Sequence, residues 1–214
     1  MPVEVISFLL DSEDERKRLE FQMVLQCAPL LKGIKVACII NIDRRHVGEL
    51  NDILKGTDIE YMILMVREGK CLSVFYRRRE LSSYLKKEDV REFLESFGYV
   101  CQDLEKVLQR LSARVCRYCS RKGRFPHEIG AFLDYPIDDV RGFIERDGRG
   151  EILSGYWKVY HDPGKARMIF LAYDKARISA VNEFLAGGTI REIACKRVLQ
   201  EFSRGDEGGS YELR

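Results

Sequence analysis

The chain has 214 residues, of which 36 are Lys or Arg and 34 are Asp or Glu, and 45% of its residues are hydrophobic. This length favours one medium-sized domain that buries a core without a disulfide or metal staple. The near-neutral charge excludes a globally basic nucleic-acid coat and a highly acidic disordered chain. The apolar runs are too short to span a bilayer, and the N-terminal region is acidic where a signal peptide is basic. Seven scattered Cys indicate reduced thiols rather than a disulfide framework. We therefore expect a soluble cytoplasmic protein.

Hydrophobic periodicity predicts alternating helices and strands in the first half of the chain. In chain order these are a helix opened by a capping box at 12–15, a strand at 34–42, a helix at 47–54, strands at 61–66 and 71–76, and helices at 80–97 and 102–118. Pro29 is expected to interrupt the first helix, because proline lacks the backbone donor that a helix interior needs. A short polar loop joins the strands at 61–66 and 71–76 and predicts a β-hairpin. Its first strand is apolar on both faces and is expected to be central in the sheet.

The second half predicts short helices, a strand and a long helix. After a break at 123–126 these are helical segments at 127–133 and 137–146, a strand at 155–160, a helix from 163 to about 185 and a last helix from 190 to about 202. Asp162 and Pro163 form an N-cap and a first helical position, and Thr189 with Glu192 forms a capping box. The strand at 155–160 either joins the main sheet or forms a small wing beside the two preceding helices.

Together the elements predict an α+β (mixed α/β) fold. We expect a small, roughly four-stranded mixed sheet that includes the β-hairpin and is surrounded by seven or eight helices. Residues 1–202 are expected to form a single compact domain, with a subdivision near 122–126 as an alternative. Residues 203–214 lack apolar periodicity and are expected to be a flexible tail.

Three blocks of the sequence resemble a known protein family. They are Cys27-Ala-Pro-Leu-Leu-Lys-Gly-Ile-Lys, the run from Phe125 to Ile144 with its His-Glu-Ile-Gly, and Ser154-Gly-Tyr-Trp-Lys-Val-Tyr. They resemble the bacterial family catalogued as domain of unknown function 3793, over roughly residues 27–177. The family has no established activity, so the resemblance implies neither a catalytic role nor a cofactor. This sequence departs from the family pattern at Asp134, where a Gly is expected, and in its Cys116/Cys119 pair.

The first candidate site is a thiol site. Cys27 as a nucleophile or ligand needs a group that favours the thiolate, and His127 is the candidate acid–base partner, with Glu128 beside it to orient the ring. These residues need to meet in space, together with Trp157, for such a site to exist. The alternative is that Cys27 is a buried thiol and His127 is a structural capping residue.

The second candidate site is a ligand-binding wall. Tyr156, Trp157 and Lys158 bring aromatic rings and a cation together on a strand, on which a flat acidic or aromatic cofactor could stack. Arg117 and Arg121 belong to a basic helical stripe that could hold an acidic group. The alternative is a core Trp flanked by half-exposed tyrosines.

The charge pattern argues against nucleic-acid binding, and the cysteine spacing argues against a metal site. Residues 106–124 carry seven basic side chains and no acid, whereas 126–147 are acidic, so these segments are expected to pack against each other. The helix pair at 127–146 has helix-turn-helix spacing, but its second helix begins with acids that phosphates would repel, which makes nucleic-acid binding unlikely. Cys116 and Cys119 supply two of the four ligands of a zinc site, and we predict no metal site.

These observations predict a small-molecule enzyme or sensor with a Cys27/His127 site. Whether the protein is an enzyme stays open. The alternatives are a non-catalytic binding module for an acidic or aromatic cofactor, and a protein- or nucleic-acid-interaction module that uses the 127–146 helix pair. The chain lacks a phosphate-binding glycine loop, so no particular cofactor is predicted, and the sequence does not predict an oligomeric state.

Overall fold

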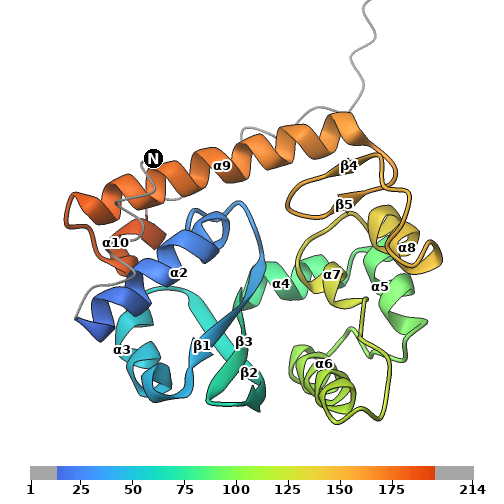
Figure 1. Cartoon of the computed structure of the whole chain (residues 1–214), viewed down its shortest axis with the longest axis horizontal. Helices are drawn as coiled ribbons and strands as arrows, with labels where there is room; N and C mark the ends of the chain where they lie inside the picture. Colours follow the sequence, from blue (N-terminus) through green and yellow to red (C-terminus); the bar gives the residue numbers. More distant parts are fainter. Residues whose placement is uncertain (1–13, 196–214) are drawn as a thin grey trace, which may run out of the picture.

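A computed structural model describes residues 14–195 of the chain. In chain order its elements are α2 (Glu15–Leu31), β1 (Ala37–Asp43), the 3-10 helix η1 (Arg44–Glu49), α3 (Leu50–Leu54), β2 (Ile59–Arg67), β3 (Lys70–Arg77), α4 (Arg78–Leu85), α5 (Glu88–Glu95), α6 (Leu104–Cys119), α7 (Ile129–Phe132), α8 (Ile137–Glu145), β4 (Leu153–Ser154), β5 (Lys158–Val159), α9 (Pro163–Leu185) and α10 (Ile190–Cys195). The α+β class that the sequence predicts is confirmed. Figure 1 shows α2, α3 and α10 on one side of the main sheet, α4 to α8 on the other, and α9 lying across both groups.

The main sheet differs from the predicted one in size, direction and strand order. Within residues 14–195 it has three strands in the order β1-β3-β2, and both pairings are antiparallel. A fourth strand is therefore not confirmed, and the described pairings are antiparallel where a mixed sheet was expected. The expectation that the 61–66 strand is central is also wrong, because β3 lies between β1 and β2. Residues 61–66 are apolar on both faces for a different reason: helices cover both faces of this small sheet.

The strand at 155–160 forms the predicted wing rather than a fourth strand of the main sheet. Ser154 pairs with Lys158 and Leu153 with Val159, in a separate two-stranded antiparallel hairpin. This hairpin lies beside α8 and below the first turns of α9 (Figure 1). Its position brings Trp157 against residues of the α7–α8 pair.

Helix α2 does not stop where proline was expected to interrupt it. Its N-cap is Asp14, whose carboxylate accepts a hydrogen bond from the Lys17 N–H at 3.0 Å, whereas Ser12 of the expected capping box lies outside the described residues. Pro29 is buried inside the last turn, and the helix continues to Leu31. The missing proline donor removes one hydrogen bond near the helix end, where burial of the ring offsets the loss.

A buried arginine closes the end of α2. The Arg77 guanidinium, 1% exposed, donates to the Leu30 and Leu31 carbonyls at 3.0–3.3 Å and forms an ion pair with Asp58. It also donates to the Ala194 carbonyl of α10 at 3.4 Å. The last carbonyls of a helix lack intrahelical donors, and Arg77 supplies hydrogen bonds to two of these carbonyls in α2. Its bond to Ala194 also connects β3 to α10.

Two apolar clusters cover the two faces of the sheet. The first packs α2, α3, α9 and α10 against Cys38, Ile40, Ile42 and Phe75. The second packs α4 to α8 against Ala37, Leu64, Val74 and Tyr76. Alternate residues of β1 and β3 therefore point to opposite clusters, as the two-residue period of a strand requires.

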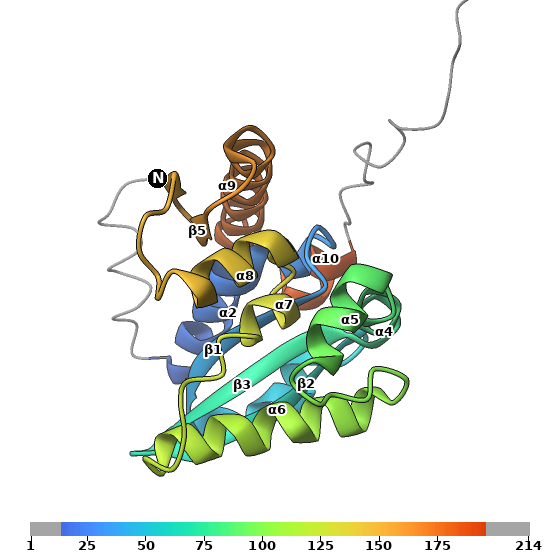
Figure 2. The ribbon, with the colours of Figure 1, turned by 90° about the vertical axis from the view of Figure 1, so that its right-hand side faces the viewer.

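A β-bulge in β2 is satisfied by α6. The register of β2 against β3 shifts between Ile63 and Met65, at Leu64. The Leu64 carbonyl accepts hydrogen bonds from the Ser112 hydroxyl at 2.7 Å and from the Cys116 thiol at 3.4 Å. These contacts fix α6 along the sheet (Figure 2) and give Cys116 a structural partner.

The predicted caps of the C-terminal helices are confirmed. The Asp162 carboxylate accepts from the Lys165 N–H at 2.9 Å, with Pro163 as the first residue of α9. Thr189 and Glu192 bond reciprocally, at 2.8 Å from the Thr189 N–H and at 3.2 Å from the Glu192 N–H. The predicted continuation of the last helix to about 202 and the predicted tail at 203–214 lie outside the described residues.

Candidate functional site

An apolar cleft of about 290 Å³ lies between the α7–α8 pair and the β4–β5 hairpin. We call it the aromatic cleft. Its lining comprises Phe125, His127, Ile129, Gly130, Leu133, Tyr135, Asp139, Val140, Phe143, Trp157 and Lys158. The structure thus brings three predicted site residues to one place: His127, Trp157 and Lys158.

Aromatic rings form the walls of this cleft. The His127 ring lies between Phe125 and Phe143, with centroid distances of 5.1 and 5.0 Å. On the other wall the Tyr135 and Trp157 rings are stacked at 5.1 Å and an interplanar angle of 29°. Trp157 is 7% exposed and also contacts Phe170 at 4.5 Å, so this wall is a rigid, apolar aromatic surface.

A buried carboxylate holds the Trp157 wall in place. Asp139, 3% exposed, accepts a hydrogen bond from the Trp157 indole N–H at 2.7 Å. Its other oxygen accepts from the backbone N–H groups of Tyr160 and His161 at 2.7 and 3.0 Å. One side chain of α8 therefore fixes both β5 and the chain that leads into α9.

The polar groups of the aromatic cleft differ in how fully they are bonded. The Lys158 ammonium donates to the Gly148 carbonyl at 2.7 Å and forms an ion pair with Glu151 at 3.1 Å. In contrast, neither ring nitrogen of His127 has a hydrogen-bond partner within residues 14–195. His127 thus has hydrogen-bonding capacity left for a ligand.

Glu128 does not orient His127, although it is adjacent in sequence. Its side chain is 1% exposed and forms an ion pair with Arg114 of α6. It also accepts a hydrogen bond from the Tyr99 hydroxyl at 3.0 Å. This buried pair joins the basic helix to the acidic segment, as the charge pattern predicts for these two parts of the chain.

Cys27 lies in a different part of the molecule from His127. It is 1% exposed in the cluster around α2, α9 and α10, and its Sγ lies 2.7 Å from the Cys38 Sγ. The hydrogen bond with Cys38, and then burial, raise the pKa of the Cys27 thiol above its ordinary value. Its contacts and those of His127 involve different elements, so the expected convergence of Cys27, His127, Glu128 and Trp157 is not observed.

The other predicted ligand-binding residues, Tyr156, Arg117 and Arg121, do not line the aromatic cleft. The Tyr156 hydroxyl donates to Asp174 of α9 at 2.8 Å, and its ring packs edge-on against Tyr173. Arg117 and Arg121 are exposed and do not line the cleft.

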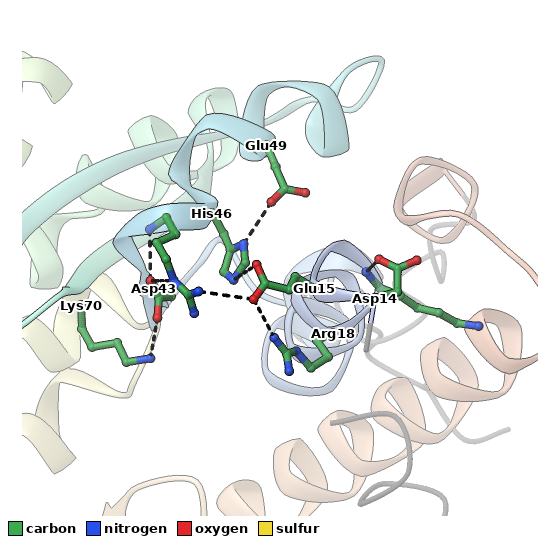
Figure 3. Close-up of polar contacts among 9 residues, drawn as sticks. Asp14, Glu15, Arg18, Asp43, His46, Glu49 and Lys70 are labelled. Carbon is green, nitrogen blue, oxygen red and sulfur yellow. Dashed lines mark hydrogen bonds and ion pairs between the residues drawn. The ribbon is translucent and has the colours of Figure 1, made fainter. Parts of the chain in front are cut away.

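A second, charged cleft lies at the opposite end of the sheet, between α2, η1 and the β2–β3 turn. Figure 3 shows its side chains. Glu15 accepts from Arg18 and from Arg45, both at 3.3 Å, and Asp43 bonds Arg45 at 3.2 Å and Lys70 at 3.4 Å. The cations of this cleft are thus paired with its acids. These surface pairs link three elements and each contribute about 0–1 kcal/mol.

Within the described range, no group of three or more His, Cys, Asp or Glu side chains is arranged to hold a metal ion. No described helix combines the length and apolarity needed to cross a bilayer.

The family model described as "Protein of unknown function (DUF3793)" matches residues 23–194. The chain belongs to this family. Comparison with curated proteins found no match. Comparison with solved structures found none either.

Residue 134, where the family resemblance leads us to expect Gly, has a backbone conformation that suits glycine. Asp134 has a φ of 58°, in the left-handed region that a glycine adopts without strain. The carboxyl group is largely buried, and this burial raises its pKa to about 6 against the opposing charges of Lys35 and Lys87. Asp tolerates this conformation better than most residues, but at the cost of a desolvated acid.

Sequence reasoning did not single out Lys35, although it packs next to the aromatic wall. Lys35 is 9% exposed, and its ammonium lies 4.9 Å from the Tyr135 ring centroid and 5.6 Å from that of Tyr173. Burial lowers its pKa. The signal was a lysine inside an otherwise apolar run, between Ile34 and Val36. Asp139 gave no such signal, because the sequence does not distinguish it from the adjacent Asp138. Only the structure shows that Asp138 is exposed and Asp139 is buried.

Proposed function

We propose that this protein binds a small planar molecule in the aromatic cleft, with His127 as the group that hydrogen-bonds the polar edge of the ligand. The observation that carries the proposal is His127 itself: an imidazole without a hydrogen-bond partner in the described part of the chain, held between two phenyl rings in an otherwise apolar cleft. Ligand sites combine apolar walls with a few polar groups that fix orientation. The volume of about 290 Å³ is at the lower end for such sites and favours a ligand of one or two rings.

Between an acidic and an aromatic ligand, the contacts favour the aromatic one. Lys158 is the cation of the cleft, and its ammonium already bonds Glu151 and the Gly148 carbonyl. A ligand acid would compete with that pair, whereas a flat ring needs only van der Waals contact with the aromatic side chains that line the cleft.

The Cys27/His127 enzyme or sensor remains a second candidate that the contacts favour less. An enzyme or sensor of this kind needs His127 within reach of Cys27 as its acid–base partner. The contacts of Cys27 lie with the cluster around α2, α9 and α10, whereas the His127 ring packs against Phe125 and Phe143. A binding role for the aromatic cleft does not need this pair to meet.

Fluorescence of the single Trp tests this proposal directly, because Trp157 lines the cleft. We suggest titrating the full-length chain with 2-naphthol and with 2-naphthoate, which share a ring system and differ in charge. We expect saturable quenching by both, with naphthoate binding no more tightly than naphthol. His127→Ala should weaken naphthol binding by roughly 2- to 12-fold, the equivalent of one neutral hydrogen bond.

His161→Ala is the matched control, because His161 is exposed and contributes only its backbone N–H to the site. It should bind naphthol as the wild type does. The proposal is wrong if naphthol quenches Trp157 without saturation, or if His127→Ala and the wild type bind equally. Much tighter binding of naphthoate would instead support an acidic ligand.

A further inference from the structure

Two buried thiols from different elements meet in the apolar cluster around α2, outside the lining of the aromatic cleft. Cys27 lies in the penultimate turn of α2 and Cys38 in β1, and their sulfurs are 2.7 Å apart. The side chains are 1% and 6% exposed and belong to one apolar cluster. Of the seven cysteines, no other two have sulfurs in hydrogen-bond contact within residues 14–195.

A buried cation adjoins this thiol pair. Lys35 belongs to the turn that connects α2 to β1, and its positive charge acts on both sulfurs. The rings of Tyr135 and Tyr173 hold the ammonium group, as described above. The thiolate is the form that takes part in thiol–disulfide exchange, and a cation at this position favours it. For Cys27 this effect opposes the larger effects of the Cys38 contact and of burial, which raise the pKa of the thiol.

We propose that Cys27 and Cys38 are a dithiol–disulfide site that exchanges with low-molecular-weight disulfides. Cys38 is the more exposed of the two and attacks one sulfur of the small disulfide as a thiolate, which breaks its S–S bond and releases one small thiolate. Cys27 then attacks the Cys38 sulfur of the mixed disulfide and releases the second small thiolate.

This exchange is balanced without a further reactant. The protein loses two electrons and two protons as the Cys27–Cys38 bond forms, and the small disulfide is reduced to two thiols that take up those protons. Lys35 is a positioning residue whose charge stabilises the attacking thiolate. The reverse reaction, with two small thiols, restores the protein dithiol.

The disulfide would tie α2 to the sheet. The two cysteines are 11 residues apart in the sequence, so the bond closes a short loop in the unfolded chain. Loop closure of this size raises the midpoint of thermal unfolding by roughly 5–10 °C for a chain of this length, provided that the native geometry accommodates the bond. Oxidation is therefore expected to stabilise the half of the molecule around α2 and β1.

Peptide mapping of the full-length protein tests this proposal. The chain is equilibrated in glutathione buffers of graded disulfide content until its thiol pattern is constant, then alkylated under denaturing conditions and digested with trypsin. Cleavage after Lys32 and Lys35 separates the two cysteines, so residues 19–32 and 36–44 stay linked only through a disulfide. We expect this linked pair in oxidising buffer, its loss on reduction, and its absence in Cys27→Ser and Cys38→Ser.

Two comparisons keep the result specific. Cys119→Ser should form the linked peptides as the wild type does. In a time course after addition of glutathione disulfide, Lys35→Met should form the linkage about tenfold more slowly, detected with peptide 33–44 because the tryptic site at 35 is lost. Lys86→Met, which removes an exposed lysine, should not change the rate. Alkylation of both Cys27 and Cys38 in every buffer would overturn the proposal, as would a stable glutathione adduct without the internal bond. Neither result depends on whether the aromatic cleft binds a ligand.

Discussion

Replacing Asp139 by Asn tests whether this buried carboxylate fixes the wall of the aromatic cleft. Its oxygens accept three hydrogen bonds, one from the Trp157 indole and two from the backbone N–H groups of Tyr160 and His161. Asn has the same shape but a single acceptor oxygen. If that oxygen serves the two backbone donors, the amide NH2 faces the indole N–H, and two donors oppose each other.

The free-energy cost follows from these contacts. A buried donor left without an acceptor costs about 1–3 kcal/mol, and each of the two remaining bonds loses about 1 kcal/mol when its acceptor loses charge. We therefore expect Asp139→Asn to lower the free energy of unfolding by about 3–5 kcal/mol. The midpoint of thermal unfolding should fall by roughly 6–20 °C.

Urea unfolding followed by circular dichroism measures this loss. Asp138→Asn, on the exposed neighbour, is the control and should stay within about 0.5 kcal/mol of the wild type. Combining Asp139→Asn with Trp157→Phe removes the opposed donor, so the double variant should lose about 1–2 kcal/mol less than the sum of the single ones. A loss below 1 kcal/mol in Asp139→Asn, or strict additivity in the cycle, would refute the reasoning.

Three other substitutions test buried contacts elsewhere. Arg77→Met should lower the free energy of unfolding by about 3–5 kcal/mol, because it removes the donor to the end of α2 and leaves Asp58 without this partner; denaturant unfolding checks it, and a loss under 1 kcal/mol contradicts it. Asp134→Asn should stabilise the protein progressively as the pH rises from 4 to 7, by up to about 3 kcal/mol. The raised pKa, about 6, means that the folded protein holds a proton that the unfolded chain releases near pH 4, so the wild type loses stability across that window. A pH-independent difference would exclude this origin. Ser112→Ala should lower the free energy of unfolding by about 1–2 kcal/mol, because the Leu64 carbonyl keeps only the weak Cys116 thiol as a donor. Thermal unfolding measures this loss, and an unchanged midpoint would show that water replaces the Ser112 hydroxyl.

Features of the structure that depend on neighbours in sequence were predictable. The N-cap at Asp162 and the capping box at Thr189 form between residues three apart, so the local sequence specifies them completely. The 61–66 and 71–76 hairpin follows from a short glycine-containing turn. The α+β class follows from the periodicities of these segments. The expected single domain over 1–202 remains a prediction.

Features that depend on how elements pack were not predictable to the same degree. Periodicity shows that a strand is buried on both faces, but not which strands flank it. The prediction therefore placed β2 at the centre of the sheet, whereas β3 lies there. Pro29 breaks an isolated helix, whereas burial and the Arg77 donor near the helix end allow α2 to continue.

The candidate site divides in the same way. The sequence by itself identified His127, Trp157 and Lys158 by residue type, and Cys27 as a thiol of interest. Only the tertiary structure decided their partners: His127 lies with the aromatic wall, and Cys27 lies with Cys38. The physical reason is that pairing across the sheet depends on the three-dimensional packing of helices whose local sequences carry no information about one another.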